Sequence, residues 1–296
     1  MEHTVVVIGL SFVSVCIAKH LAETCGRYVV LVSTETLQDV VSNENIAHIV
    51  QHPAHKTQQQ NTLHTFQRLA PNPGTLAVVD RLQQSEIGTA SSSQSILINP
   101  RQMLVDMYQF LTSLGPQFKH FVLPSQVSSL EHYCSMFPTA TSFVNCSVGE
   151  SMGCVRVQSV LLHLNSALDY AVTHKTALNQ HTKLTPVVGN PQLAVLSGPH
   201  QYNDFYIHPR DSDTLTLLYR ASTYYPHIVA ACKVLSSEVI FKQCMENQCG
   251  KIFLTIGPRG QKIVNVLGFG LTEADVIDEA IEYVPLLVKS ELKAHF

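Results

Sequence analysis

The chain has 296 residues, of which 45% are hydrophobic and only 14% are Asp, Glu, Lys or Arg. This composition supplies a large core and excludes a disordered or coiled-coil protein. The formal net charge is -3 and there is no long basic run, which argues against a nucleic-acid-binding surface. Because single cores rarely grow beyond about 250–300 residues, we expect one compact unit of two intergrown lobes.

Residues 4–33 predict a β-α-β unit. Residues 4–8 form a continuous β-branched run, which is typical of a buried parallel strand, and Gly9 ends it. Apolar residues then recur at helical spacing as far as Leu21, Gly26 closes the helix, and residues 28–32 form a second apolar strand. The length of this unit is that expected for a dinucleotide-binding half.

The next part of the chain, residues 35–95, is rich in Gln, Asn, His, Ser and Thr. A helix is possible over residues 58–69, and residues 91–93, all serine, indicate a loop or an edge between lobes. Residues 100–114 predict an amphipathic helix, which Gly115 caps. Short buried strands follow at residues 118–123 and 142–146.

The second half of the chain predicts strands, a hairpin and two helices. The strands cover residues 155–164, 194–196, 252–256 and 262–267. Residues 202–209 and 214–219 predict a hairpin across the turn-forming residues 210–213, and residues 229–244 predict a helix. A final helix covers residues 272–294, with a variant capping box between Thr272 and Asp275 and a kink at Pro285.

The order of these segments resembles that of the D-amino-acid oxidase and D-aspartate oxidase family over nearly the whole chain. The segments that carry the resemblance are VVVIG at 5–9, DVVSN at 39–43, INP at 98–100, FVNCS at 143–147, YNDFYIHP at 202–209, and the tail at 263–287. The resemblance implies an α/β fold: a Rossmann-like FAD-binding-type domain with an interleaved antiparallel-sheet substrate, or cap, domain. The implied boundaries are 1–60, 95–155 and 255–296 for the first domain, and 61–94 and 156–254 for the second.

Members of this family use FAD to oxidise a D-amino acid to an imino acid, and oxygen is reduced to peroxide. Carried over residue by residue, the resemblance implies that Tyr202 and Tyr206 contact the substrate, and that Arg259 binds its carboxylate. The positions that would bind the cofactor are Gly9, Ser11, Ser14, Ser42, Asn43, Ser147, Gly268 and Gly270.

Several of these positions depart from the family pattern. The phosphate-binding loop GxGxxG reads GLSFVS here, so only Gly9 survives, and Ser11 puts a side chain where the pyrophosphate should meet backbone. The second strand ends at Ser33 without the acidic residue expected for the ribose hydroxyls. Residues 44–48 replace the small residues that lie over the flavin, and Val148 replaces a glycine.

Two other kinds of site find little support in the sequence. His48, His52, His55 and His64 cluster in the polar segment, but no acid or cysteine joins them at a suitable spacing, so we predict no metal site. Ser147 lacks the GxSxG context of a hydrolase nucleophile.

The losses fall on separate segments that share only the cofactor and the substrate. The favoured hypothesis is a catalytically impaired or inactive protein of this fold that serves as a protein-interaction or regulatory subunit. The alternative is an FAD-dependent oxidase of D-amino acids. The cofactor is FAD if there is one, the expected partner is a protein rather than nucleic acid or membrane, and the absence of a signal peptide, a membrane span and a C-terminal peroxisomal signal predicts a cytoplasmic location.

Overall fold

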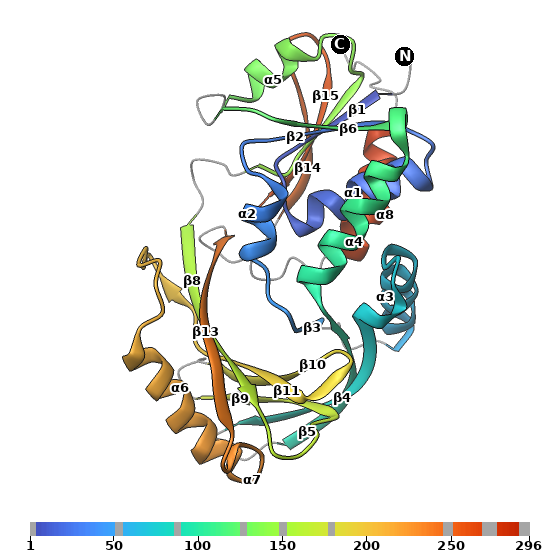
Figure 1. Ribbon diagram of the computed structural model, residues 1–296. Helices are drawn as coiled ribbons and strands as arrows, with labels where there is room; N and C mark the ends of the chain where they lie inside the picture. The colour runs from blue at the N-terminus through green and yellow to red at the C-terminus, as the bar shows by residue number, and fades with distance from the viewer. Residues whose placement is uncertain are drawn as a thin grey trace. The chain divides into compact units, whose positions relative to one another are not determined.

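The computed structural model describes residues 4–50, 56–85, 90–124, 129–147, 153–176, 181–244, 251–267 and 277–289. The chain divides into two compact units (Figure 1). The first unit comprises Met1–Ser42, Leu104–Met152 and Gln243–Phe296, and the second comprises Asn43–Met103 and Gly153–Lys242. The assignment of one domain to cofactor binding and the other to substrate stays a prediction.

The first unit is built on a six-stranded sheet with the order β14-β15-β7-β1-β2-β6. Its strands are β1 (Thr4–Ile8), β2 (Tyr28–Ser33), β6 (Phe118–Val122), β7 (Ser142–Asn145), β14 (Lys251–Ile256) and β15 (Lys262–Leu267). All neighbouring strands are parallel except β14, which pairs antiparallel with β15. The β-branched residues of β1 lie at the centre of this sheet, and Val5, Val6, Val7 and Ile8 are fully buried, as expected for a parallel strand covered on both faces.

The helices of the first unit are α1 (Phe12–Glu23), α2 (Leu37–Ser42), α5 (Leu130–Met136), α8 (Ile277–Lys289) and the larger part of α4 (Pro100–Ser113). A short 3-10 turn, Gly115–Gln117, connects α4 to β6. The buried stripe of α4 is the one that the sequence predicts, since Met103, Leu104, Met107 and Leu111 are all fully buried.

The second unit contains a nine-stranded sheet with the order β12-β8-β11-β10-β9-β4-β5-β3, and β13 pairs with β8. These strands are β3 (His48–Val50), β4 (Leu76–Ser85), β5 (Ala90–Ile98), β8 (Gly153–His163), β9 (Tyr170–Lys175), β10 (His181–Val187), β11 (Asn190–Ser197), β12 (Gln201–Tyr202) and β13 (Lys233–Cys244). The helices are α3 (Lys56–Leu69), α6 (Asp211–Tyr224) and α7 (Pro226–Val229), and Pro73–Thr75 forms a 3-10 turn.

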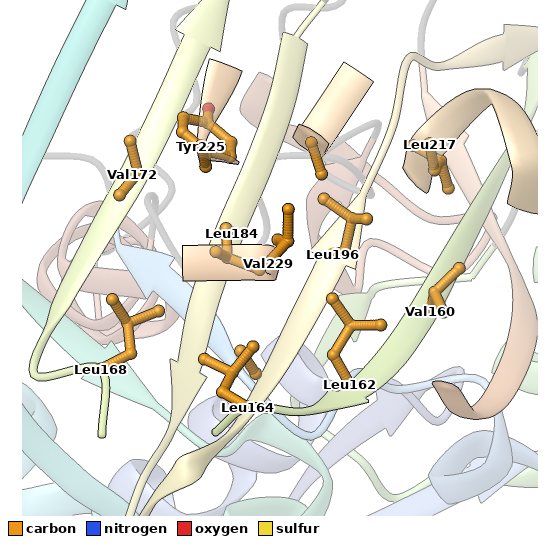
Figure 2. Close-up of a cluster of buried hydrophobic side chains, with 12 residues drawn as sticks. Val160, Leu162, Leu164, Leu168, Val172, Leu184, Leu196, Leu217, Tyr225 and Val229 are labelled. Atoms are coloured by element: carbon orange, nitrogen blue, oxygen red, sulfur yellow. The ribbon is translucent and has the colours of Figure 1, made fainter. Parts of the chain in front are cut away.

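The core of the second unit lies between one face of this sheet and helices α6 and α7 (Figure 2). Alternate residues of β8 and β11, such as Val160, Leu162 and Leu196, pack there with Leu217 of α6 and Val229 at the end of α7. A smaller apolar cluster on other sheet positions includes Leu97 and Val195. The sheet therefore buries apolar side chains on both of its faces.

Most of the predicted elements are confirmed, but three predictions are wrong. The serines at 91–93 lie within β5 rather than in a loop. Residues 214–219 belong to α6 rather than to a hairpin strand, because Asp211 and Asp213 fall in the first turn of a helix, where they favour its positive end. Residues 233–244 form the strand β13 instead of a helix. The described part of the last helix is Ile277–Lys289, and Thr272 and Asp275 lie outside the described residues.

Candidate functional site

The turn from β1 to α1 is the best-defined part of the site that the resemblance implies. Gly9 has a φ of 91°, a backbone conformation that residues with a side chain rarely adopt. A Cβ on Gly9 would also lie 2.9 Å from the amide nitrogen of Ser147 and 3.0 Å from the carbonyl of Cys146. Glycine is therefore required here for the close approach of the segment that follows β7, whether or not a ligand binds.

The N-terminus of α1 is closed by its own serines. Ser11 is the N-cap residue, and its hydroxyl accepts a hydrogen bond from the amide of Ser14 at 3.2 Å. In return, the amide of Ser11 donates to the Ser14 hydroxyl at 2.8 Å. This reciprocal capping box satisfies helix-end donors that a phosphate would otherwise use. Ser14 is fully buried. The two predicted cofactor positions, Ser11 and Ser14, therefore form hydrogen bonds with each other.

The end of β2, where the family carries an acid, holds a chain of three side chains. Ser33 is 2% exposed, and its hydroxyl donates to the carbonyl of Glu35 at 2.6 Å. The Ser33 hydroxyl has only one hydrogen, so Nε2 of His120, 2.9 Å away, must be the donor to it. Nδ1 of His120 then accepts from the Tyr108 hydroxyl at 2.7 Å.

Burial lowers the pKa of His120 and raises the pKa of Tyr108. Both shifts favour the neutral forms that this hydrogen-bond chain requires. Sequence reasoning identified the missing acid at Ser33, but it did not identify His120 and Tyr108, which come from β6 and α4. No local pattern could have paired them with Ser33, because they lie more than seventy positions further along the chain.

Ser147 lies close to Gly9, and it also forms hydrogen bonds within the protein. Its hydroxyl donates to Oδ1 of Asn145 at 2.6 Å, and its amide donates to the same atom at 3.1 Å. The side-chain amide of Asn145 in turn donates to Asn265 on β15 at 2.9 Å. The structure thus brings Gly9, Ser11, Ser14 and Ser147 together at the carboxyl edge of the sheet, which is where ligands bind in open α/β sheets.

Arg259 lies at the opposite edge of that sheet. It is exposed in the turn between β14 and β15, next to Lys262, which pairs with Ser142 at the start of β7. Gly9, in contrast, follows Ile8, which pairs with Asn145 at the end of β7. The structure therefore does not bring Arg259 to the edge that carries Gly9.

The other predicted cofactor positions contribute less. Ser42 and Asn43 are exposed after α2, and the Ser42 hydroxyl donates to the carbonyl of Asp39 at 2.7 Å. Gly268, Gly270 and Val148 lie outside the described residues.

The segment at 44–48 is tied within the second unit. The buried carboxylate of Glu44 lies 2.8 Å from the Lys242 ammonium, and Nε of Arg101 donates to the Glu44 carbonyl at 2.9 Å. Two cationic side chains thus fix the segment that in the family carries small residues.

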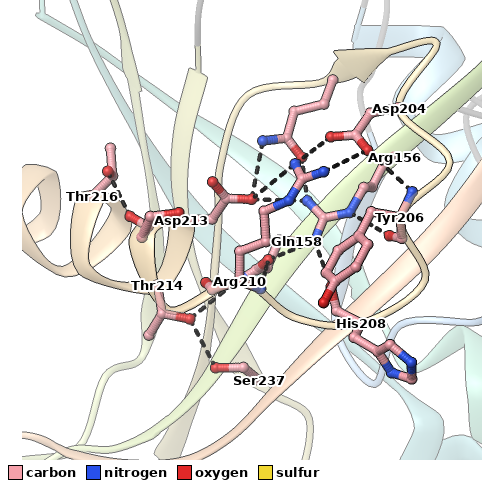
Figure 3. Close-up of polar contacts among 12 residues, drawn as sticks. Arg156, Gln158, Asp204, Tyr206, His208, Arg210, Asp213, Thr214, Thr216 and Ser237 are labelled. Carbon is pink, nitrogen blue, oxygen red and sulfur yellow. Dashed lines mark hydrogen bonds and ion pairs between the residues drawn. The ribbon is translucent and has the colours of Figure 1, made fainter.

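In the second unit, Tyr202 and Tyr206 flank an irregular segment that a buried arginine anchors. Tyr202 ends β12, and about half of each tyrosine side chain is exposed. The anchor is Arg156 of β8, which has no exposed surface. Figure 3 shows its side chain surrounded by acceptors from this segment and from α6.

All five N–H donors of Arg156 have partners. The guanidinium donates to the carbonyls of Tyr206 at 2.8 Å and His208 at 2.9 Å, and to the side chains of Gln158, Asp213 and Gln201. Sequence reasoning missed Arg156 and Gln158. The signal was present, because two polar residues alternate with valines inside an otherwise apolar strand.

A second arginine holds the outer side of the same segment. Arg210 pairs with both carboxylate oxygens of Asp204, and its guanidinium lies 4.9 Å from the centre of the Tyr206 ring. The pKa of Asp204 is lowered mainly by its hydrogen bond to Arg210. The segment therefore has a fixed conformation, although Phe205 and Ile207 are 67% and 66% exposed.

The part of the chain that the structure describes was compared with the requirements of a metal site and of a membrane-spanning helix. No group of three or more His, Cys, Asp or Glu side chains there is arranged to hold a metal ion, and His52 and His55 lie outside the described residues. No helix in the same part of the chain is both long enough and apolar enough to cross a membrane.

The fold is shared with oxidases and dehydrogenases of amino acids. L-proline dehydrogenase from P. horikoshii is 12% identical with a TM-score of 0.70, and the match covers 99% of this chain and 95% of that one. Glycine oxidase from Geobacillus kaustophilus is also 12% identical, with a TM-score of 0.68 and coverage of 99% and 96%. No protein-family model and no curated protein matches the sequence.

One further structure of this fold contains the cofactor. Glycerol-3-phosphate dehydrogenase from Bacillus halodurans, complexed with FAD, is 13% identical with a TM-score of 0.63, and the match covers 97% of this chain and 64% of that one. The predicted fold, and the resemblance to amino-acid oxidases on which it rests, are therefore confirmed. At these identities the likeness concerns the fold alone.

The described residues fit a flavin dinucleotide poorly. Gly9 keeps the required turn, but the Ser11 side chain and the capping box occupy the helix end. At the end of β2, the buried Ser33 hydroxyl forms hydrogen bonds with the backbone carbonyl of Glu35 and with His120. The chain keeps the turn at Gly9, and hydrogen bonds within the protein engage Ser11, Ser14 and Ser33.

Proposed function

We propose that this chain is a catalytically impaired or inactive protein of the amino-acid-oxidase fold that acts as a protein-interaction or regulatory subunit. The observation that carries the proposal is the Ser11–Ser14 capping box at the N-terminus of α1. The amide of Ser14 donates to the Ser11 hydroxyl, and the Ser11 side chain lies where a pyrophosphate would need to contact the backbone.

A role in protein interaction is supported by the segment between Tyr202 and Arg210. Phe205 and Ile207 expose most of their apolar surface, while Arg156 and Arg210 fix the backbone around them. Apolar side chains held rigidly in solvent lose little conformational entropy on binding, which is what a protein-recognition surface requires.

The first experiment asks whether the protein binds FAD. The purified chain should show no flavin absorption, no thermal shift on addition of FAD, and no release of peroxide from D-amino acids. A yellow protein with one flavin per chain would contradict the proposal and support the alternative function, an FAD-dependent oxidase of D-amino acids. The observation that favours this alternative is the retained turn at Gly9, which preserves the path from β1 to α1.

The second experiment tests the interaction surface. A complex captured from the native source by the full chain should be lost with a Phe205→Ala/Ile207→Ala double variant. The matched control is Leu286→Ala, which removes another exposed apolar side chain, from α8 of the first unit. Capture that is equal for the double variant and the control would exclude this segment as the interaction surface.

A further inference from the structure

Residues 203–209, called the anchored segment from here on, bond to the rest of the second unit along one edge. The carbonyls of Tyr206 and His208, two residues apart, both accept hydrogen bonds from Arg156, at 2.8 and 2.9 Å (Figure 3). The backbone at residues 204–207 runs without a turn or a bend. In such an extended stretch alternate residues direct their N–H and C=O groups to the same edge, so the intervening residues direct theirs away from Arg156.

The intervening residues, Phe205 and Ile207, present an open strand edge. No hydrogen bond joins the backbone of either one to another residue in the part of the chain that the structure describes. Their side chains are 67% and 66% exposed. Unpaired N–H and C=O groups beside exposed apolar side chains form a template to which another extended chain adds. Because Arg156 and Arg210 already fix the backbone, this pairing costs little conformational entropy.

The sequence of the anchored segment is complementary to itself. In an antiparallel pair of two copies that sets Tyr206 opposite itself, Phe205 lies opposite Ile207 of the other copy. One residue further out, Asp204 lies opposite His208, so an acid meets a base. Directly opposite residues of the hydrogen-bonded kind exchange both N–H···O=C bonds, which gives every open backbone group of the first pair a partner.

We propose that the anchored segment is a dimerisation surface, occupied by the same segment of a second copy across a two-fold axis at Tyr206. A two-fold interface uses one patch on both copies and therefore requires a self-complementary patch, which this register provides. The inference rests on the protein-interaction role proposed above and names the partner as a second copy of the chain. It does not depend on whether a flavin binds.

Helix α6, which begins directly after Arg210, adds apolar area to this surface. Leu215 and Tyr219 lie one turn apart on the same face of α6, and they are 67% and 73% exposed. A stable dimer buries about 1,200–2,000 Å² in total, which is more than a short ladder of backbone hydrogen bonds supplies. The helix therefore extends the interface beyond the paired segments.

The test measures the dimer dissociation constant of the full chain by sedimentation equilibrium over a range of concentrations. The parent should be a dimer that dissociates on dilution. Phe205→Glu and Ile207→Lys should each weaken the dimer by roughly thirtyfold or more, the scale of a lost interface hot spot. Each of these variants places a charge opposite an apolar side chain of the other copy.

The double variant Phe205→Glu/Ile207→Lys tests the register. Its two substituted side chains carry opposite charges and face each other across the axis, so it should dimerise roughly tenfold more tightly than either single variant. The matched control is Leu286→Glu, which puts a charge on an exposed position of α8 in the first unit and should leave the dimer unchanged. Urea denaturation at low concentration should show equal stability for all four variants, because the substituted side chains are exposed.

Hydrogen exchange gives a readout that depends on the backbone alone. The amides of Phe205 and Ile207 should exchange slowly in the parent dimer and rapidly in the single variants, because the bonds across the axis protect them. The inference is overturned if the parent is a monomer at every concentration, if either single variant dimerises like the parent, or if the double variant is no tighter than the single ones. A monomeric chain whose captured complex is still lost on substitution of this segment overturns the inference and leaves the proposed function standing.

Discussion

The N-terminus of α1 and the segment between Tyr202 and Arg210 are fixed in opposite ways. At α1, Ser11 and Ser14 lie three residues apart and bind each other. In the second unit, Arg156 is completely buried, and four of its five N–H donors bind groups 45 to 57 residues away. The N-terminus of α1 is therefore capped by short-range hydrogen bonds of modest strength, whereas the segment between Tyr202 and Arg210 depends on a single desolvated cation.

The largest effect should come from removing that cation. Arg156→Met removes the donor to Gln201 and to the carbonyls of Tyr206 and His208, so we expect a loss of about 3–5 kcal/mol in the free energy of unfolding. Urea denaturation measures it. The matched control is Arg210→Met, whose partly exposed ion pair with Asp204 is screened by solvent and should contribute much less to stability. Equal losses of stability in the two variants would show that burial of Arg156 does not set it apart from Arg210.

The second effect concerns the backbone beneath the capping box. Gly9→Ala forces a side chain into a φ of 91° and within 2.9 Å of the Ser147 amide, which should cost about 3 kcal/mol. Gly26→Ala is the control: its φ is 61°, but nothing lies within 4 Å of the added carbon, so we expect a cost of about 1 kcal/mol. A Gly9→Ala protein no less stable than the control would show that the turn tolerates a side chain.

The third effect is a pH dependence in the second unit. Burial and the neighbouring charges of Lys183 and His181 lower the pKa of His200 to about 4, below the ordinary value of 6.5, so the unfolded chain binds a proton that the folded chain does not. Stability should therefore fall as the pH decreases from about 6.5 to 4. His200 contributes about 2 kcal/mol to this loss, after allowance for partial exposure. Urea titrations at several pH values measure the slope.

His200→Gln should reduce this slope without abolishing it. Burial also lowers the pKa of His120 and His181, so these residues act in the same direction. A slope that is unchanged in His200→Gln would contradict the assignment.

What could be predicted from the sequence follows the same division between local and distant interactions. The unit from β1 to β2 was predicted almost to the residue, because its β-branched runs, helical spacing and glycines are local signals. The loss of the ribose-binding acid at Ser33 and the substitution at Ser11 were also visible as single letters in the sequence. What replaced them, a capping box and a chain through His120 to Tyr108, depends on geometry.

The second unit was harder to predict for the same physical reason. Residues 214–219 alternate like a strand, yet they form part of α6, whose first turn carries Asp213, the partner of Arg156. Residues 233–244 mix apolar and polar side chains in an order that fits either state, and pairing with β8 makes them a strand.

The smallest effect on stability, and the sharpest test of the comparison, concerns Ser11. Ser11→Ala should cost about 1 kcal/mol and Ser11→Gly only a few tenths, since glycine is a tolerated N-cap residue. Ser129→Ala, at the N-cap of α5, controls for a capping loss far from the turn at Gly9.

Ser11→Gly also removes the side chain from the position where a pyrophosphate would approach. We nevertheless expect no thermal shift with FAD, because Ser33 and His120 still close the ribose end of the site. A shift with FAD in Ser11→Gly but not in Ser11→Ala would mean that one side chain alone excludes the cofactor, and that the end of β2 matters less than its hydrogen bonds indicate.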